Sequence, residues 1–468
     1  MLKYSELFAL LRHKPQVGEN SRWGFVAMSL AIIVIAYDFT AFSVAIPKIS
    51  QEFNSTLNHS QWVFNGYALT LGVFIITGGH LADLYGRRRL FFIGITFFCV
   101  CSVLGAYATS INMLIVCRIV MGLGGAMIWP AVLGMVYALF SKEKAGVAGG
   151  FIIGVAGISN ATGPTVGGLL TDFLSWRWIL LINIPIALMA LALTWKTIAP
   201  ENLPWKHKKV DYVGVLTLSV SLFSLLFGLD LLAEPQLDNW LIIGLFLLFV
   251  LSMLAFVIIE RNQNEQALIP QELMKNGVFL AIGLTTLMMS TIFFVALLYL
   301  PQFFMREWGY TAVESGVALL PMILTYAFIS FFSGAIYHRL GAKCLVSIGV
   351  SLLALGMLLL AYLVVSTPYW QVAVMMFILG CGIGLAYPTV TTAAMMVVPV
   401  SRMSVAGGII YMFRTAGGAV GVGISTCIIF LSSSPLAGMQ NAFLFNAILA
   451  LIGLVICLLW VNVHTSES

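Results

Sequence analysis

Charged residues are scarce in this sequence. Asp, Glu, Lys and Arg make up 9% of its 468 residues, whereas hydrophobic residues make up 60%. A soluble domain contains about 25% charged residues, because its surface must be covered with polar groups. The composition therefore excludes an ordinary soluble fold. The net charge of +5 does not predict nucleic-acid binding, because the basic residues are spread between apolar runs and do not gather on one face.

Patterns for metal binding and catalysis are also missing. The seven cysteines lie inside or at the edges of apolar segments, without CxxC or Cys/His spacing, so we expect them to pack as small apolar residues. The six histidines lie in loops or at span ends and form no cluster with acidic residues. The sequence therefore predicts no metal site and no cofactor, and it argues against a membrane-embedded enzyme.

Long apolar runs are abundant. A helix needs about 20 apolar residues to cross a hydrocarbon core of about 30 Å. On this criterion the sequence predicts an all-α integral membrane protein with about fourteen transmembrane helices. The expected spans are 24–46, 60–82, 90–108, 111–130, 146–168, 176–195, 211–231, 240–259, 277–300, 311–337, 343–364, 371–393, 405–430 and 441–462.

The distribution of Lys and Arg predicts the orientation in the membrane. Of the 23 basic residues, 18 fall in segments on the side of the N-terminus, two lie inside spans, and only Lys48, Arg177 and Arg306 fall in the opposite loops. Because basic loops are retained in the cytoplasm, we expect a multi-pass protein of the cell (inner) membrane with both termini cytoplasmic. Residues 1–22 lack the apolar core and cleavage site of a secretory signal, so we expect a cytoplasmic segment there.

Two parts of the sequence resemble each other at a nearly constant offset. Segment 122–130 matches 380–388 at an offset of 258, and the glycines at the ends of 79–86 match those of 334–341 at an offset of 255. Duplicated halves are common in transporters. The offsets predict two parallel six-helix bundles and an inserted helix pair. We expect the N-terminal bundle at 23–200, the inserted pair with its linkers at 201–265, the C-terminal bundle at 266–462 and a cytoplasmic tail at 463–468.

Two opposite charges occur at similar depths in predicted spans. At 1.5 Å per residue, Asp38 lies about 12 Å and Arg118 about 10 Å from the outer ends of their helices. Charges in a membrane are costly, so each needs a partner or a function. One interpretation is a structural ion pair. The other, which we favour because the first span has no other internal carboxylate, is that Asp38 takes up and releases a proton beside Arg118. The equivalent positions in the second half, near Ile292 and at Met376, are apolar, so we expect proton coupling in the first half.

The loop between the second and third spans combines glycines with an acid and bases. Glycine permits a tight turn, and Asp83 can pair with a nearby basic group. We interpret this segment as a latch that closes the cytoplasmic face in one state; the alternative is an ordinary basic cytoplasmic loop. The residues expected to form the latch are Gly79, Asp83, Gly86, Arg87 and Arg88.

The fifth span is rich in small residues. Glycines at GxxxG spacing permit close helix packing, and a Gly-Pro pair provides a bend. We expect a close-packed hinge that seals the outer ends of the helices, with simple packing as the alternative. The hinge residues are Gly154, Gly157, Gly163, Pro164, Gly167 and Gly168.

A central cavity between spans one, four, nine and twelve would need aromatic lining for an amphipathic substrate. The candidates that the sequence offers are Tyr37, Trp129, Phe293, Phe294, Tyr299, Tyr387 and Arg414. Arg414 has two interpretations, because it could line the cavity or bond backbone carbonyls at the glycine-rich stretch of its helix.

These segments together resemble the major facilitator superfamily, in particular its fourteen-helix drug:proton antiporter branch. The loop from Gly79 to Arg89 is similar to the family signature G-x-L-A-D-x-x-G-R-[RK], and the segment from Asp38 to Pro47 is similar to the span-one signature of the branch. Further similarities are Arg118 with Gly122 and Gly124, the glycines of span five, and Trp176-Arg177-Trp178 with Asn183 and Pro185. One departure is His338, which stands where the first half has Asp83, so we expect a weaker or pH-sensitive latch there.

The resemblance implies alternating access, with inward proton flow through Asp38 driving export of an amphipathic compound, aromatic or cationic. Arg118 would assist proton transfer. The partners expected are a small-molecule substrate, protons and the lipid bilayer, and the protein is expected to be a monomer. The alternatives are a dedicated exporter of a metabolite, lipid or siderophore, or an importer. A channel would need a continuous polar stripe, which the sparse polar interior does not provide.

Overall fold

The computed structural model describes residues 21–140, 144–199, 211–231, 239–262 and 268–461. The expected N-terminal segment lies outside these residues except for its last two positions, and the expected tail lies outside them entirely. The described chain is α-helical and contains no strand. Thirteen of its helices are long and apolar enough to cross a membrane.

The helices follow one another in three groups. The first half contains α2 (Ser21–Ala41), η1 (Phe42–Val44), α3 (Ile46–Glu52), α4 (Leu57–Tyr85), α5 (Arg87–Ala106), α6 (Ile111–Leu139), α7 (Ala145–Phe173), α8 (Arg177–Leu181) and α9 (Asn183–Thr197). The inserted pair is α10 (Tyr212–Leu231) and α11 (Asn239–Asn262). The second half contains α12 (Gln271–Lys275), α13 (Gly277–Glu307), α14 (Ala312–Ala318), α15 (Leu320–Leu360), α16 (Tyr369–Met396), η3 (Val400–Arg402), α17 (Met403–Leu431) and α18 (Pro435–Trp460).

The helix α15 contains two of the predicted spans. Its 41 residues are interrupted at Gly341, where φ is 73° and ψ is 166°, so the chain turns there without a loop. Counting the two parts separately reconciles the thirteen long helices with the fourteen predicted spans. The predicted span 311–337 begins as the separate short helix α14, whose N-terminus is closed by a capping box between Thr311 and Glu314.

Matching glycine contacts repeat in the two halves. Gly124 of α6 lies against Gly94 of α5, and a Cβ atom on Gly124 would lie 2.7 Å from the Gly94 carbonyl oxygen. Gly382 of α16 lies against Gly349 of α15 at the same 2.7 Å. Contacts this close require residues without a side chain. The two halves therefore use equivalent glycines to bring equivalent helices together.

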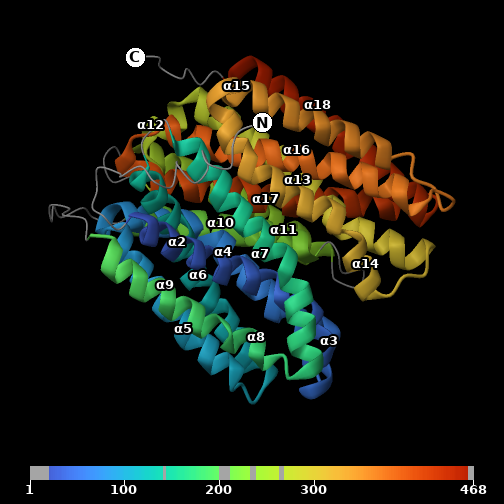
Figure 1. Ribbon diagram of the computed structural model, residues 1–468, viewed down its shortest axis with the longest axis horizontal. Helices are drawn as coiled ribbons and strands as arrows, with labels where there is room; N and C mark the ends of the chain where they lie inside the picture. Colours follow the sequence, from blue (N-terminus) through green and yellow to red (C-terminus); the bar gives the residue numbers. More distant parts are fainter. Residues whose placement is uncertain (1–20, 141–143, 200–210, 232–238, 263–267, 462–468) are drawn as a thin grey trace.

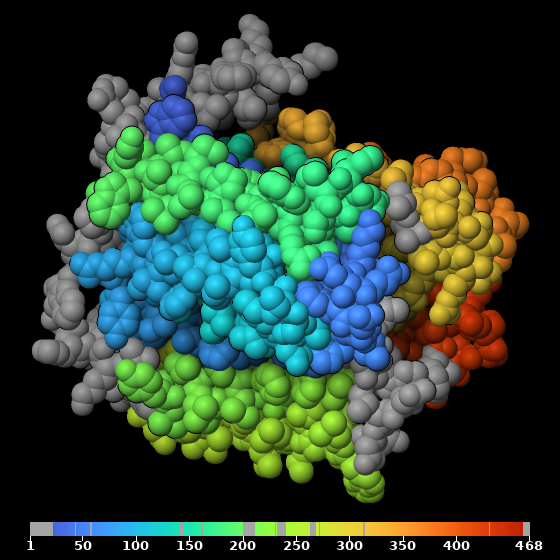
Figure 2. Space-filling model, turned by 90° about the horizontal axis from the view of Figure 1, so that it is seen from below, coloured from blue at the N-terminus to red at the C-terminus, as the bar shows by residue number. Residues whose placement is uncertain are grey.

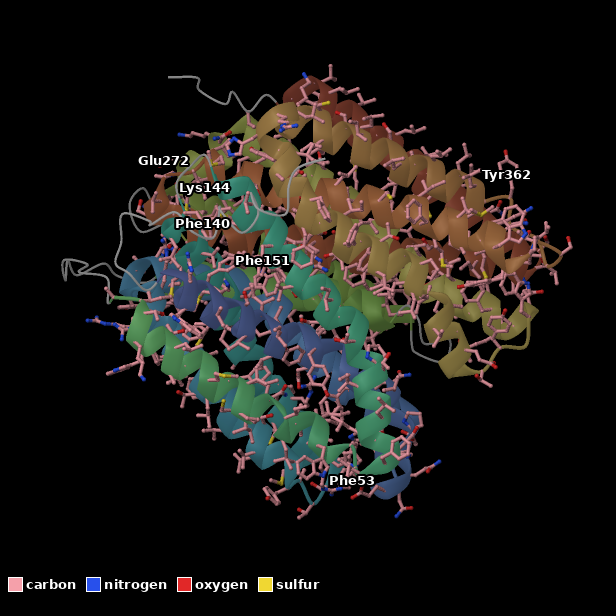
Figure 3. The ribbon with its side chains drawn as sticks, viewed as in Figure 1. Phe53, Phe140, Lys144, Phe151, Glu272 and Tyr362 are labelled. Atoms are coloured by element: carbon pink, nitrogen blue, oxygen red, sulfur yellow. The ribbon has the colours of Figure 1, made fainter. Side chains whose placement is uncertain are left out.

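The two halves contact each other most extensively through α7 with α15 and α4 with α17, and also through α6 with α17 and α7 with α16. We call the end of the molecule that carries Arg87, Lys144, Lys196 and Arg402 the inner end, because its basic residues predict that it faces the cytoplasm. Figure 1 shows the bundles together near α12, at this inner end, and diverging toward α3 and α14. In Figure 3, Phe53 and Tyr362 mark the separated outer tips.

The inserted pair packs beside both halves. Helix α10 contacts α4 of the first half and α17 of the second. Figure 2 shows α10 and α11, in yellow-green, as a layer along the blue first half. Most of α11 is exposed, as the apolar surface of a helix beside lipid would be.

Candidate functional site

Asp38 of α2 and Arg118 of α6 form an ion pair inside the first half. The Arg118 Nη1 donates to Asp38 Oδ2, and both side chains have no exposed surface. The Arg118 Nε also donates to the carbonyl oxygen of Val63 in α4, at 3.0 Å. The pair therefore connects α2, α4 and α6 within the apolar interior.

The other oxygen of the Asp38 carboxylate is also bonded. The Asn183 Nδ2, at the start of α9, donates to Asp38 Oδ1 at 2.8 Å. The guanidinium of Arg118 lies between two rings, 4.2 Å from the centroid of Phe42 and 4.4 Å from that of Tyr67. Both charges are thus held by specific partners, as burial of an ion pair requires.

Sequence reasoning placed Asp38 and Arg118 together but assigned no role to Asn183, Phe42 or Tyr67. An amide within a membrane span is a signal for Asn183, because it needs a hydrogen-bond partner there. The two rings gave no comparable signal, because apolar spans contain many aromatic residues.

Several polar atoms around the ion pair have no hydrogen-bond partner within the described residues. They include the hydroxyls of Tyr37 and Tyr67, the Arg118 Nη2 and the Asn183 Oδ1. With Asp38 fully enclosed in this conformation, a proton can reach it only after the surrounding helices move. The unpaired atoms would then be free to bind entering water.

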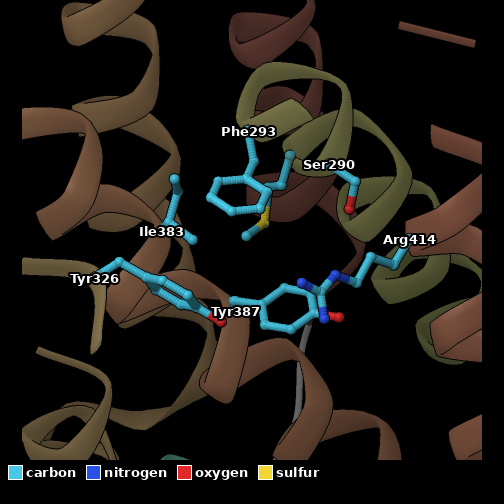
Figure 4. Close-up of a pocket in the computed structure, with 7 residues that line it drawn as sticks. Ser290, Phe293, Tyr326, Ile383, Tyr387 and Arg414 are labelled. Carbon is cyan, nitrogen blue, oxygen red and sulfur yellow. The ribbon is translucent and has the colours of Figure 1, made fainter. Parts of the chain in front are cut away.

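A second polar site lies in the other half. A small cavity between α13, α15, α16 and α17 contains Arg414, which is 9% exposed. Figure 4 shows its guanidinium beside the ring of Tyr387, 4.6 Å from the centroid. The cavity is lined by Met289, Ser290, Phe293, Tyr326, Ile383, Tyr387 and Arg414.

Three of the residues predicted to line a central cavity between the halves line this cavity inside the second half, namely Phe293, Tyr387 and Arg414. Trp129 lies close to this region, with its ring 5.0 Å from that of Tyr411, which neighbours Arg414. The remaining three predicted residues do not line this cavity. Tyr37 adjoins Asp38 in α2, Phe294 packs against Gly418, and the hydroxyl of Tyr299 bonds the Thr426 Oγ1 at 2.7 Å. Met289, Ser290, Tyr326 and Ile383 were not predicted.

The predicted latch residues Asp83 and Arg87 contact the second half. The Asp83 carboxylate accepts hydrogen bonds from the backbone N–H groups of Ser404 and Val405, at 3.3 and 2.9 Å. These groups lie at the start of α17, where the helix has unsatisfied donors and a partial positive charge. Asp83 therefore caps a helix that belongs to the other half.

Arg87 lies beside Asp83 and links three segments. Its Nη2 donates to Asp83 Oδ1 at 3.1 Å, its Nη1 donates to the Gly134 carbonyl at 3.1 Å, and its Nε donates to Ser404 Oγ at 3.0 Å. It also donates to the carbonyl oxygen of Val400. Arg87 is 4% exposed, so the network is shielded from solvent. A further bond between the halves, unforeseen from the sequence, joins the hydroxyls of Tyr137 and Thr392 at 3.1 Å.

The other three latch residues have different positions. A Cβ atom on Gly79 would lie 2.6 Å from the Ser404 carbonyl oxygen, so Gly79 permits the close approach of α4 to α17. Gly86 turns the chain between α4 and α5 with a φ of 101°, which glycine adopts readily. Arg88 contacts its own half, where its guanidinium lies 5.2 Å from the ring of Trp195.

The glycines of α7 face two different partners. Gly154 and Gly157 lie against Phe331 and Tyr326 of the second half. Gly163 and Gly167 lie against Thr40 and Ala41 of the first half.

The outer part of α7 therefore packs within its own half, and its contact with the other half lies nearer the inner end. The helix continues through Pro164. At Gly168 a Cβ atom would have no neighbour within 4 Å, so no close contact requires glycine there.

The second half lacks an acid at the position equivalent to Asp83. His338 is exposed there, with its ring near that of Tyr337. The side chain of neither N-cap residue, Lys144 of α7 or Arg402 of α17, makes a capping bond, but α17 is capped by Asp83 of the other half. The two inner contacts are therefore chemically unequal.

Comparisons with known proteins give a consistent result. A model of the Major Facilitator Superfamily matches residues 28–422. Multidrug resistance protein 3 of Bacillus subtilis (strain 168) is 30% identical over 377 residues, which are 80% of this chain and 73% of that protein. The Methylenomycin A resistance protein of the same organism is 28% identical over 424 residues, or 90% of each chain.

Among solved structures, the crystal structure of the human organic anion transporter MFSD10 (TETRAN) is similar in fold. The TM-score is 0.66 at 15% sequence identity, and the match covers 94% of this chain and 100% of that one. At this level of identity the likeness concerns the fold alone.

Proposed function

The chain belongs to the major facilitator superfamily, and from this premise we propose that it is a proton-coupled exporter of amphipathic, drug-like compounds that works by alternating access. Membership of this family makes the chain a membrane transporter of small molecules. The names of its relatives, such as Multidrug resistance protein 3, support export of drug-like compounds. We further propose that it acts as a monomer in the cell (inner) membrane with both termini in the cytoplasm.

The observation that carries the proton-coupling proposal is the buried pair of Asp38 and Arg118. When Asp38 is ionised, the two charges neutralise each other and hold α2 against α6. When Asp38 is protonated, this attraction is lost and Arg118 needs another partner. Uptake of a proton would thus favour a rearrangement of the helices of the first half, which is the link between protonation and conformation that an antiporter needs.

The contacts between the halves support alternating access. The network of Asp83 and Arg87 joins the halves at the inner end, while the outer tips diverge (Figure 1). The described conformation is consistent with a state open toward the outside. In the opposite state these hydrogen bonds would break and the outer parts of the halves would meet.

Transport in proteoliposomes tests the proposal. A pH gradient should drive uptake of a drug-like dye into inside-out vesicles, and dye movement should release protons that a pH-sensitive fluorophore detects. Asp38→Asn should abolish both signals. Asp172→Asn is the matched control, because it removes an exposed carboxylate that pairs with Lys48 at the surface; it should leave coupling intact.

A second set of variants separates proton coupling from a structural role. The double variant Asp38→Asn, Arg118→Gln removes both charges and leaves neither one buried alone. If Asp38 carries the proton, this variant should fold and move dye only down its concentration gradient. Proton-driven accumulation by the folded double variant would show that the pair is structural.

A narrower function has one specific observation in its favour. The relative that matches 90% of the chain is named for resistance to a single antibiotic, methylenomycin A. The second candidate is therefore a dedicated exporter of one compound. Growth-inhibition assays with a panel of unrelated drugs, in a host that lacks its own exporters, separate the two candidates: broad resistance supports the first, and resistance to one compound supports the second.

A further inference from the structure

Arg414 is a buried cation without a counter-charge. It is 9% exposed and lines the cavity of the second half. Within the described ranges, no carboxylate forms an ion pair with it. Its contacts are the rings of Tyr387 and Tyr411, at 4.6 and 5.7 Å, and the hydroxyl of Tyr387, to which its guanidinium donates a hydrogen bond. Arg118 has both an ionic and a hydrogen-bonded partner, so the two intramembrane arginines have different environments.

The ring contacts satisfy Arg414 only in part. A guanidinium carries five N–H donors in its plane, and cation–π contacts use its faces. The edge donors that the Tyr387 hydroxyl does not take therefore remain available to a ligand. An uncompensated charge in an apolar interior is costly, and a bound anion would remove that cost.

The rest of the cavity is lined by aromatic and apolar side chains. Its free volume in this conformation is about 10 Å³, so a ligand would enter as these side chains move apart. Phe293 and Tyr326 provide aromatic surfaces, with ring centroids 5.8 Å apart, and Met289 and Ile383 provide apolar contacts. Ser290 adds one hydroxyl beside Arg414 (Figure 4). No acidic residue lines the cavity, so it offers a cation no opposite charge.

We propose that this cavity binds aromatic anions, with the ligand's carboxylate, sulfonate or phenolate on Arg414 and its ring system against Phe293, Tyr326 and Tyr387. This inference rests on the proposed function as an exporter and specifies its substrate class. It departs from the cationic substrates that the sequence left open. The anion would form charge-assisted hydrogen bonds with the guanidinium edge, which is the strongest interaction the cavity offers.

The proposal has a consequence for the driving force. Suppose that the same number of protons enters in each cycle whichever substrate leaves. Export of a monovalent anion then moves two more net positive charges inward than export of a monovalent cation does. Anion export therefore depends more strongly on an inside-negative membrane potential. A potential imposed with valinomycin and a potassium gradient should accelerate export of an anionic dye more than that of a cationic one.

Binding of two aromatic dyes of opposite charge tests the proposal. Fluorescein is an aromatic anion and ethidium an aromatic cation, and fluorescence polarisation measures their affinity for the full-length protein in nanodiscs. Wild-type protein should bind fluorescein, and Arg414→Gln should weaken that binding tenfold or more while leaving ethidium unchanged or tighter. Arg414→Lys should retain part of the affinity. Arg306→Gln makes the same charge change at an exposed position of α13 and should have no such effect.

Two results would overturn the proposal. One is wild-type protein that binds ethidium but not fluorescein; the other is fluorescein affinity that Arg414→Gln leaves unchanged. If Arg414→Gln does not fold, the wild-type protein still gives an answer, because a ligand that binds the native state raises its melting temperature. Protection by fluorescein and not by ethidium supports the proposal, and the reverse contradicts it.

The outcomes also separate this inference from the proposed function. Fluorescein binding that depends on Arg414, without any proton-linked transport, would refute the exporter mechanism and leave the anion site intact. Proton-coupled export of ethidium that is insensitive to Arg414→Gln would refute the anion site and leave the exporter mechanism intact.

Discussion

Arg87 and Ser404 are separated by 317 positions in the sequence and are joined by a hydrogen bond of 3.0 Å from the arginine Nε to the serine Oγ. The bond connects the first turn of α5 to the first turn of α17 across the boundary between the halves. Asp83 caps α17 beside it. Both charged residues of this contact are almost fully buried, so water does not compete for its hydrogen bonds.

Arg87→Ala should open the inner end. The substitution removes the donors that reach Gly134 and Ser404 and leaves Asp83 buried without its basic partner. Spin labels at positions 196 and 339, which are exposed at the inner ends of the two halves, should report longer distances in the variant. The exposed Cys344 and Cys427 are replaced first.

The control for this experiment is Arg89→Ala, because Arg89 is an exposed base in the same helix turn. In Arg89→Ala the distribution of distances between the two spin labels should match that of the labelled protein with Arg89 unchanged. Unchanged distances in Arg87→Ala would mean that the network does not hold the inner end closed.

The losses of stability caused by removing the charges of Asp38 and Arg118 should be strongly non-additive. Either Asp38→Asn or Arg118→Gln alone leaves one buried charge uncompensated, which costs about 3–5 kcal/mol of stability. The double variant should lose less than the sum of the two single losses. Thermal or denaturant unfolding in detergent checks this, and additive losses would show that the two charges do not stabilise each other.

The paired glycine contacts should be intolerant of side chains in both halves. A Cβ atom at position 124 or 382 would lie 2.7 Å from a backbone carbonyl, and a backbone atom cannot move aside as a flexible side chain can. Gly124→Ala and Gly382→Ala should each destabilise the protein by about 1–3 kcal/mol. Gly244→Ala, where no atom lies within 4 Å, should be neutral or stabilising in the same unfolding measurement.

Gly341→Ala should cost stability through the backbone alone. Its φ of 73° with ψ of 166° is a conformation that is almost restricted to glycine, although nothing lies within 4 Å of a Cβ atom there, and the expected loss is about 1–3 kcal/mol. Gly341→Asn should lose about as much, because asparagine tolerates positive φ mainly with ψ of about 30–60°, whereas ψ at Gly341 is 166°. Gly316→Ala serves as the control, because Gly316 also has open space around it but no positive φ. Equal melting temperatures for Gly341→Ala and Gly316→Ala would contradict this interpretation.

Features set by length and composition could be predicted from the sequence. The spans followed from the thickness of the bilayer, and the proximity of Asp38 and Arg118 followed from their depths, because a costly charge must find its opposite at the same level. The glycine repeat also had a physical basis, since helices that approach to backbone contact need residues without side chains.

The composition of the cavity could be predicted only in part. Phe293 and Phe294 are neighbours in α13, yet only Phe293 lines the cavity while Phe294 packs on Gly418. Which of them faces inward depends on the rotation of the helix, and a helix that is apolar on all sides gives no sign of that rotation. Tyr326 and Ser404 were missed for a related reason, because their contacts depend on how helices distant in sequence are aligned.

The position of α10 has a consequence for the boundary between the halves. Leu226 of α10, Gly72 of α4 and Thr415 of α17 meet at one point, where a Cβ atom on Gly72 would lie 3.2 Å from the leucine methyl and 3.6 Å from the threonine oxygen. Rotation of one half against the other would move α4 and α17 past each other beneath the apolar side chains of α10. These side chains include Phe227, which packs on Trp62 of α4. Such a covering would shield the contact between α4 and α17 from lipid tails while the two sides shift.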